Sequence, residues 1–221
     1  LGNDKDLRKI IESKNIPNMI FYGPSGVGKT TLASIISKET NKALYKLNGT
    51  TSSTSDIKDI ISDIGTFNTQ NGILLYLDEI QYLNKKQQQT LLEFIETGKI
   101  TLIASTTENP YFYIYNAILS RCTVFEFKTV KSEDIKKAVK RAFNFISQEY
   151  KKTITFNDNV IEYISQSCSG DVRKSINIVE LCFLACNNGN DDNINIDIET
   201  AKQIANKSVI KYDKDGDSHY D

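Results

Sequence analysis

The segment from Gly23 to Thr30 limits the possible folds of this chain more than any other part of the sequence. It reads Gly-Pro-Ser-Gly-Val-Gly-Lys-Thr and fits the pattern GxxxxGK[ST], with an apolar run before it and a helical pattern that opens at Lys29. Glycines let backbone N–H groups curl around a phosphate, and a helix N-terminus adds free donors and a favourable dipole. A chance glycine-rich turn would not explain the strand and helix patterns that flank it. The segment therefore predicts a phosphate-binding loop between a strand and a helix.

The side chains of this loop have separate expected roles. Lys29 is expected to bridge the β- and γ-phosphates of a nucleotide, and the hydroxyl of Thr30 is expected to ligate Mg²⁺. The expected cofactors are therefore ATP and Mg²⁺. The residues predicted to bind them here are Gly23, Pro24, Ser25, Gly26, Val27, Gly28, Lys29, Thr30 and Thr31.

A second chemical feature is the apolar run Ile73–Leu77, which ends in the consecutive carboxylates Asp78 and Glu79. Side chains alternate along a strand, so the two acids point in different directions. We expect Asp78 to hold Mg²⁺ through a water, and Glu79 to orient and polarise an attacking water as a general base. An ordinary strand end with solvated acids is the alternative. The second acid favours a hydrolase over a small-molecule kinase with a P-loop.

Short apolar runs alternate with helical patterns in the first part of the chain. The expected strands are Asn18–Tyr22, Ala43–Leu47, Ile73–Leu77, Ile100–Ala104 and Val124–Phe127, and the expected helices between them are Lys29–Glu39, Ser55–Ile64 and Lys85–Glu96. This alternation indicates right-handed crossovers and a parallel sheet covered on both faces. We therefore predict the α/β class over residues 1–128: a P-loop parallel sheet with helices on both faces.

The pattern becomes helical after Phe127. Ser132 with the following Glu133 and Asp134 is a typical helix start, with a cap and acidic residues in the first turn. We predict a small all-helical lid domain over residues 129–207 and a linker over residues 208–221. The expected helices of the lid are Glu133–Tyr150, Asn157–Cys168, Asp171–Cys186 and Ile198–Lys207.

Three further residues or pairs lie where they could contact a nucleotide. Thr106 and Thr107 follow the expected strand Ile100–Ala104, and polar groups at the carboxyl ends of parallel strands face the ligand crevice. Turn chemistry before Pro110 explains these threonines equally well. Arg121 precedes the last strand, where spacing also allows an ordinary surface salt bridge. Arg173 opens a helix of the second domain and could reach the phosphates, although an arginine at a helix start is usually solvated.

Composition excludes little. Lys and Arg number 27 against 28 Asp and Glu, so no charge excess indicates nucleic acid. The four cysteines show no CxxC pairing, which favours reduced, buried thiols in a cytosolic protein over a metal site. The longest apolar run is Ile73–Leu77, far below the roughly 20 residues needed to span a bilayer. We expect a cytoplasmic protein without a membrane segment.

Taken together, these residues resemble the AAA+ superfamily, and more narrowly the replication-associated recombination ATPases of the RarA/MgsA type, which are relatives of clamp loaders. The resemblance is closest in TLIASTTENPYFYIYNAILSRCTVFEF, where the family has a TTENP strand end followed by a leucine-serine-arginine-cysteine segment. GDVRKSINIVE and YDKDGDSHYD are similar to the family's lid helix and its post-lid signature. The Asp213–Asp217 stretch is therefore interpreted as this signature, because its glycine does not fit a calcium loop.

The resemblance implies roles that spacing could not supply. Thr107 resembles the sensor 1 residue, with Thr106 as the close alternative. Arg121 resembles the arginine finger, which acts on ATP bound to a neighbouring subunit, and Arg173 resembles sensor 2 in the lid. The expected catalytic residues are thus Glu79, Lys29, Arg121 and Thr107.

The family also implies a function: ATP hydrolysis coupled to DNA replication, recombination or repair, at stalled forks or gapped DNA, through an oligomer with shared ATP sites. The implied partners are single-stranded, forked or gapped DNA, further copies of the protein, and single-strand-binding protein or replisome components, with a nucleoid-associated location. A nucleotide-gated scaffold without turnover is the main alternative, and a small-molecule kinase is the weaker one.

The ends of the sequence suggest a fragment. The chain begins with Leu1, and the family has a preceding segment that packs on adenine and a following oligomerisation domain. We therefore expect weak ATPase activity from the chain by itself.

Overall fold

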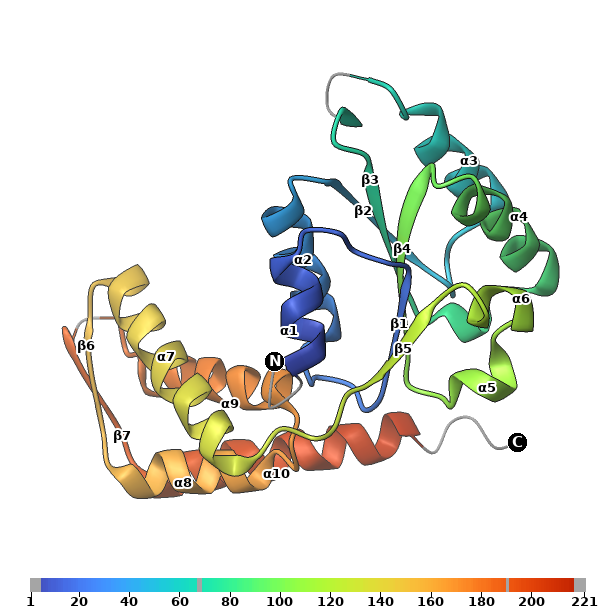
Figure 1. Ribbon diagram of the computed structural model, residues 1–221. Coiled ribbons are helices and arrows are strands. Elements are labelled where there is room, and N and C mark those ends of the chain that lie inside the picture. The colour runs from blue at the N-terminus through green and yellow to red at the C-terminus, as the bar shows by residue number, and fades with distance from the viewer. Residues whose placement is uncertain (1–4, 67–68, 190, 217–221) are drawn as a thin grey trace. The chain divides into compact units, whose positions relative to one another are not determined.

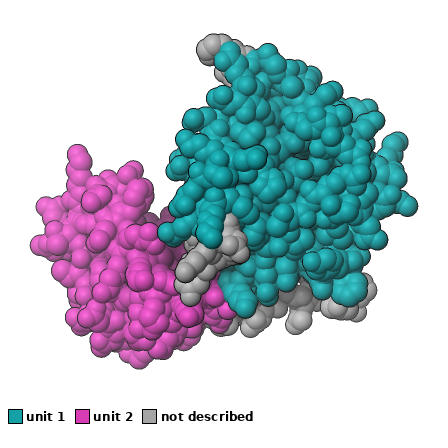
Figure 2. Space-filling model, in the orientation of Figure 1, with its two compact units in different colours: residues 1–128 teal, residues 129–221 magenta. Residues whose placement is uncertain are grey.

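The computed structural model describes residues 5–66, 69–189 and 191–216. Its elements are drawn in Figure 1. The chain divides into two compact units, residues 1–128 and 129–221, which are coloured separately in Figure 2. Each unit has its own hydrophobic core, so each is described by itself.

The first unit is built on a five-stranded sheet with the strand order β2-β3-β4-β1-β5. Every neighbouring pair in it is parallel. All five strands therefore end at the same edge, which we call the carboxyl edge, and begin at the opposite, amino edge. The strands are β1 Met19–Tyr22, β2 Ala43–Asn48, β3 Ile73–Asp78, β4 Ile100–Thr106 and β5 Thr123–Glu126.

Helices cover both faces of this sheet (Figure 1). Alternation along the strands divides the core in two. Leu74 and Tyr76 of β3 pack with α1 and α2, whereas Leu75 and Leu77 pack with α3, α4 and α6. The helices are α1 Lys5–Glu12, α2 Lys29–Thr40, α3 Thr54–Ser62, α4 Lys85–Glu96, α5 Pro110–Tyr113 and α6 Asn116–Leu119, with a 3₁₀ turn, η2, at Ile80–Tyr82.

Two helix starts near the carboxyl edge are fixed by capping boxes. Ser53 caps α3 in exchange with Asp56, and Asn84 caps α4 in exchange with Gln87. These reciprocal bonds satisfy N–H groups that would otherwise lack partners within the helix. The amide of Gln87 also donates to the backbone carbonyl of Ser52 at 2.9 Å. The loop after β2 and the start of α4 are thereby joined.

Within its described residues, 129–189 and 191–216, the second unit contains four helices and a two-stranded parallel sheet. Its core gathers apolar residues from all of these elements, including Phe143, Ile164, Phe183 and Ile194. Cys168 and Cys182 are buried in it as free thiols, and burial raises the pKa of Cys182 to about 12. The elements are α7 Ser132–Tyr150, β6 Thr153–Phe156, α8 Asp158–Ser167, α9 Val172–Cys186, β7 Asn193–Ile196 and α10 Ile198–Gly216.

The predicted α/β class is confirmed, since all five strands and the helices between them are present. The expectation of an all-helical second domain was wrong in one respect, because β6 and β7 form a small sheet there. The segment expected to be a linker from residue 208 is helical as far as Gly216. Residues 217–221, with the last part of the YDKDGDSHYD segment, lie outside the described residues.

Candidate nucleotide-binding site

The glycine-rich loop connects β1 to α2 at the carboxyl edge and depends on glycine at its first position. Gly23 has φ +140°, and a Cβ built there would lie 2.0 Å from the carbonyl oxygen of Phe127. The amide of Phe127 donates to the carbonyl of Tyr22 at 2.7 Å, which holds the two segments together. Gly28 also needs positive φ, at +99°. The loop can take this path only with glycine at these positions.

Lys29 is the first residue of α2, and its side chain is buried against the loop. Its Nζ donates to the carbonyls of Gly23 at 2.6 Å and Pro24 at 2.8 Å. The ammonium group is therefore held inside the curve of the loop, at the positive end of the α2 dipole. A phosphate in the curve would meet this cation and the free N–H groups of the helix start.

Next to the loop, four polar side chains form a connected network. The Thr30 Oγ1 lies 2.9 Å from the hydroxyl of Tyr76, and the Tyr76 hydroxyl lies 2.8 Å from Ser105 Oγ and 3.2 Å from Asp78 Oδ1. Ser105 donates in turn to Asp78. Burial raises the pKa of Tyr76 to about 12, so its phenol remains protonated and can donate at neutral pH.

Glu79 follows directly after β3 in a left-handed backbone conformation, with φ 53° and ψ 49°. Such a conformation is uncommon for a residue other than glycine and typically costs on the order of 1–3 kcal/mol. Two contacts stabilise it. The Gly49 amide donates to the carbonyl of Asp78 at 2.8 Å, and Gln81 Nε2 donates to Glu79 Oε2 at 2.5 Å.

Gly49 fits against this turn because it lacks a side chain. A Cβ at Gly49 would lie 2.2 Å from the carbonyl oxygen of Glu79. The loop after β2 therefore packs directly on the backbone of the acidic pair. The Gln81 Oε1 is buried without a partner among the described residues, so the amide of Gln81 is oriented by its single bond to Glu79.

A pocket of about 400 Å³ opens beside the network. Hydroxyl, carboxylate, amide and ammonium groups line it beside apolar surface, so it can take a ligand that carries polar and charged groups. Its lining residues are Thr30, Lys46, Leu47, Asn48, Thr51, Ser52, Asp56, Tyr76 and Asp78.

The end of β4 brings the two threonines to the same edge in different environments. Thr106 is buried, and its Oγ1 accepts from the amide of Glu108 at 3.0 Å. Thr107 is exposed. The carbonyl of Thr106 also accepts from the amide of Gly23 at 3.2 Å, which ties the strand end to the glycine-rich loop. Thr107 is therefore the threonine whose side chain is open to a ligand.

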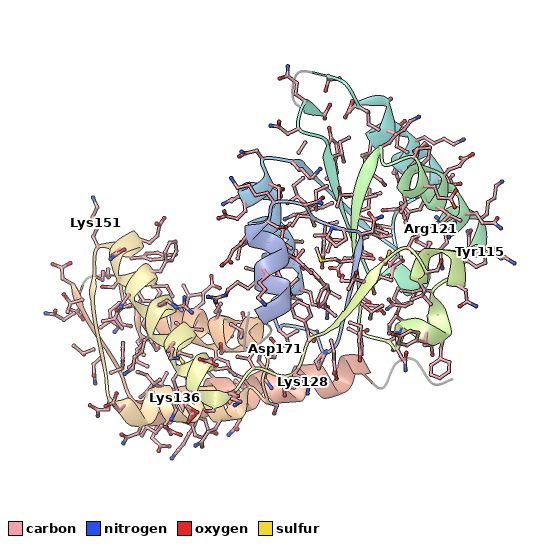
Figure 3. All side chains as sticks on the ribbon, in the orientation of Figure 1. Tyr115, Arg121, Lys128, Lys136, Lys151 and Asp171 are labelled. Carbon is pink, nitrogen blue, oxygen red and sulfur yellow. The ribbon has the colours of Figure 1, made fainter. Side chains whose placement is uncertain are left out.

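Arg121 lies at the opposite, amino edge, between α6 and β5 (Figure 3). It forms an ion pair with Glu96 at 2.5 Å and donates to the carbonyl of Ala117 at 2.9 Å. Its side chain is 41% exposed and that of Glu96 is 45% exposed. The structure thus separates Arg121 from Lys29, Thr30, Asp78 and Glu79, which meet at the carboxyl edge.

Arg173 belongs to the second unit, where it is exposed in the first turn of α9. Asp171 caps this helix by accepting from the amide of Lys174 at 2.9 Å. Gly170, just before the cap, has φ +91°, and a Cβ there would lie 2.6 Å from the Cβ of Thr129. The sensor 2 role of Arg173 stays a prediction.

Sequence reasoning missed four contributors to this site: Gly49, Tyr76, Gln81 and Ser105. Tyr76 lies two residues before Asp78, so strand alternation places both on the same face of the sheet. Ser105 lies on the neighbouring strand beside them. This periodicity was the available signal, but a tyrosine inside an apolar run looks like an ordinary core residue.

The residues of the carboxyl edge fit a nucleotide with Mg²⁺. The path of the loop requires glycine at position 23, where a Cβ would meet the carbonyl of Phe127, and the ammonium group of Lys29 is held against the loop carbonyls. Thr30 and Asp78 supply the hydroxyl and carboxylate oxygens that Mg²⁺ prefers.

Comparison with known families agrees with this geometry. Residues 19–130 match the ATPase family associated with various cellular activities (AAA). The chain belongs to the AAA family. Residues 149–221 match a second family, described as the AAA C-terminal domain. The resemblance inferred from the motifs is thereby confirmed.

Several curated relatives of this AAA chain carry the same name. Replication-associated recombination protein A is 36% identical in Bacillus subtilis and 31% identical in Escherichia coli, and each alignment covers the whole chain. The ATPase WRNIP1 of Dictyostelium discoideum is 31% identical, also over the whole chain. The alignments cover 52% of the Bacillus subtilis protein, 50% of the Escherichia coli protein and 27% of WRNIP1. The chain thus spans about half the length of the two bacterial relatives and about a quarter of the length of WRNIP1.

Solved structures share the fold of this AAA chain. A mutant of RuvB from Thermotoga maritima has a TM-score of 0.73 and 24% identity, covering 94% of this chain and 67% of that one. A second structure from the same organism, described as the RuvB Holliday junction branch migration motor, has a TM-score of 0.68 and 23% identity, covering 93% of this chain and 65% of that one.

Among the residues that the structure describes, no helix is long and apolar enough to cross a membrane.

Proposed function

We propose that the chain binds ATP with Mg²⁺ at residues 23–31 and hydrolyses it. The observation that carries this proposal is that the glycine-rich loop with Lys29, the linked side chains of Thr30 and Asp78, and Glu79 all lie at the carboxyl ends of strands of one parallel sheet. Membership of the AAA family supports nucleotide binding.

Each of these groups has one task in the proposed reaction. Lys29 and the backbone amides of the loop bind and orient the phosphates. Thr30 and Asp78 hold a magnesium ion, which would neutralise phosphate charge when bound. Glu79 accepts a hydrogen bond from the attacking water and orients it, and its hydrogen bond from Gln81 fixes the carboxylate for this task. Thr107 is the proposed contact to the γ-phosphate or the lytic water, because its side chain is open at the strand end whereas Thr106 is bonded to its own turn.

Arg121 acts on a nucleotide held by a second copy of the protein in this proposal. The pairing of β5 with β1 sets Thr123 beside Met19 and Glu126 beside Tyr22. The first residue of β5 thus lies about four residues from Gly23 along the sheet, or roughly 13 Å at about 3.3 Å per residue, and Arg121 lies in the turn before it. Its own phosphate loop is well beyond hydrogen-bond distance. An arginine supplied by a neighbouring subunit makes the ATP site a shared one, with Arg173 as the proposed γ-phosphate contact from the second unit.

The biological role is proposed from the relatives. Their names refer to replication-associated recombination, and they match the chain along its whole length. We infer that the protein acts in DNA replication, recombination and repair, on single-stranded, forked or gapped DNA, as an oligomer. Single-strand-binding protein and replisome components are the proposed further partners, with the nucleoid as the place of action.

ATP turnover by the full-length protein, measured with and without single-stranded or forked DNA, tests this proposal. We expect turnover that DNA stimulates and that Glu79→Gln lowers roughly 10²- to 10⁴-fold, the usual contribution of a general base. Nucleotide affinity should be retained in this variant, because the phosphate loop is intact. Undiminished turnover in Glu79→Gln would remove Glu79 as the base. Turnover that responds to no form of DNA would contradict the proposed role.

A further inference from the structure

The hydroxyls of Tyr76 and Ser105 do more than fill space in the core, because they connect Thr30 to Asp78 through hydrogen bonds. Three hydroxyls and one carboxylate follow one another: Thr30 contacts Tyr76, Tyr76 contacts Ser105, and Ser105 donates to Asp78. Tyr76 is 1% exposed and Ser105 is fully buried. Both residues therefore satisfy their hydrogen bonds within this network.

Donor counting gives the network a direction. Each hydroxyl has one hydrogen to donate, whereas the carboxylate only accepts. Ser105 gives its hydrogen to Asp78, so its oxygen is available to accept from Tyr76. The Tyr76 oxygen is then available to accept from Thr30 at 2.9 Å. The self-consistent arrangement runs from Thr30 through Tyr76 and Ser105 to Asp78, and hydrogen bonds in such a chain strengthen one another.

This direction has a consequence for Thr30. When its hydrogen points to Tyr76, the lone pairs of Oγ1 point elsewhere. Thr30, Tyr76 and Asp78 all line the same pocket of about 400 Å³. The hydroxyl oxygen of Thr30 and the carboxylate of Asp78 are thus presented to that pocket as acceptors, which is the state in which oxygen binds a divalent cation.

We propose that Tyr76 and Ser105 are positioning residues for the divalent cation of the ATP site. Their hydroxyls form a one-way relay that orients the Thr30 hydroxyl as an oxygen ligand and the Asp78 carboxylate to hold the cation through a water. The inference rests on the proposed function, and it adds two residues that act on the cation through Thr30 and Asp78. Tyr76 is the central member, because its hydroxyl contacts all three of the others.

The two relay residues differ in their expected importance. Without Ser105, the Tyr76 hydroxyl can still donate directly to Asp78, which lies 3.2 Å away. Without the Tyr76 hydroxyl, the path from Thr30 is broken at its first step. Tyr76→Phe should therefore have a larger effect than Ser105→Ala, and the double variant should resemble Tyr76→Phe because the relay is already broken.

Binding of a fluorescent ADP analogue to the 221-residue chain tests the inference without relying on catalysis. Affinity is measured in EDTA and over a series of Mg²⁺ concentrations. For Tyr76→Phe we expect the Mg²⁺ concentration at half-maximal enhancement to rise roughly 10-fold, as is usual when an outer-sphere partner is lost. Affinity in EDTA should stay unchanged. Ser105→Ala should shift the Mg²⁺ curve in the same direction by less.

The matched control is Tyr45→Phe. Tyr45 also donates to an aspartate, Asp63, at 2.9 Å in the same unit, but Asp63 is not part of the network. This control should leave the Mg²⁺ curve of the wild-type chain in place. Ser105→Ala provides an independent test if Tyr76→Phe does not fold by circular dichroism.

The outcomes separate the two proposals. A wild-type chain that binds no nucleotide with or without Mg²⁺ would contradict the proposed function itself. A wild-type chain with Mg²⁺-dependent binding, together with Tyr76→Phe and Ser105→Ala variants whose Mg²⁺ curves match Tyr45→Phe, would overturn the relay alone. Equal losses in EDTA and in Mg²⁺ would also overturn it, because they indicate a purely structural effect.

Discussion

The two edges of the sheet in the first unit are built in different ways. At the carboxyl edge, backbone contacts at Gly23 and Gly49 leave no room for a Cβ, and the polar side chains are bonded to one another. At the amino edge, Arg121 and Glu96 form a partly exposed ion pair, and Gly98 in the turn before β4 has open space around it. The groups proposed to hold a nucleotide within the chain are thus fixed in advance. The group proposed to act on another copy lies on a long side chain at an open surface.

The largest expected effect in this contrast between the two edges is that of replacing Arg121. Arg121→Ala should lower ATP turnover of the assembled protein by roughly 10³- to 10⁵-fold, the range for an arginine supplied in trans. Nucleotide binding by the single chain should be unaffected, because Arg121 lies at the opposite edge from the loop. Turnover and binding are measured on the same preparations.

Mixing of variants provides the control for Arg121. Neither Lys29→Ala nor Arg121→Ala should turn over ATP alone, but a mixture should regain part of the activity, because each supplies what the other lacks. A mixture as inactive as its components, or an Arg121→Ala variant with normal turnover, would place Arg121 outside the shared site.

The second test compares one glycine from each edge. Gly23→Ala should lower the free energy of unfolding by about 3 kcal/mol or more, since its Cβ meets a backbone carbonyl in addition to the strain of positive φ. Gly98→Ala has φ +67° but nothing within 4 Å, so about 1 kcal/mol is expected. Urea unfolding measures both. Equal losses would mean that the Phe127 carbonyl moves aside easily.

Gln81 provides a smaller effect at the carboxyl edge. Gln81→Ala removes the hydrogen bond that orients Glu79, so turnover should fall roughly fivefold, equivalent to about 1 kcal/mol for one hydrogen bond. Nucleotide affinity should not change. Steady-state turnover and equilibrium binding check this. A rise in turnover would instead show that Gln81 restrains the carboxylate.

The smallest effect is expected at Glu96. Glu96→Gln removes the charge that faces Arg121, but both side chains are over two-fifths exposed. The free energy of unfolding should therefore change by less than about 1 kcal/mol, as for most surface ion pairs. Thermal unfolding at low and high salt measures this. A larger, salt-independent loss would show that the amino edge is as tightly built as the carboxyl edge.

Among the residues at the carboxyl edge, the sequence indicated those that phosphate and metal chemistry demands at fixed spacing. Gly23, Lys29, Thr30, Asp78 and Glu79 were found in this way, and the structure brings them to one edge. Contacts that depend on which strands are neighbours could not be found from the chain order. Ser105 meets Tyr76 because β4 lies beside β3, and Gly49 meets Glu79 because β2 lies on the other side of β3.

The fold shows the same limit in its smaller elements. β6 and β7 were not expected from the sequence. Each has only four residues, Thr-Ile-Thr-Phe and Asn-Ile-Asn-Ile, whose polar-apolar alternation is typical of a strand but lies between longer helical patterns. α1 was also not among the expected helices, although its apolar residues Leu7, Ile10 and Ile11 have the spacing of one helix face. The expected end of α10 at Lys207 had no glycine or proline behind it, and the helix runs to the first glycine, Gly216.

The contact between Gly23 and Phe127 joins the phosphate loop to the segment where the first unit ends. Phe127 is followed by Lys128, the last residue of the first unit, so the peptide on which the phosphate loop rests is also where the chain leaves that unit. The loop backbone cannot be displaced toward Phe127 without pushing this exit point. Any movement of the loop backbone toward Phe127 would therefore also move the residues at which the chain leaves the first unit.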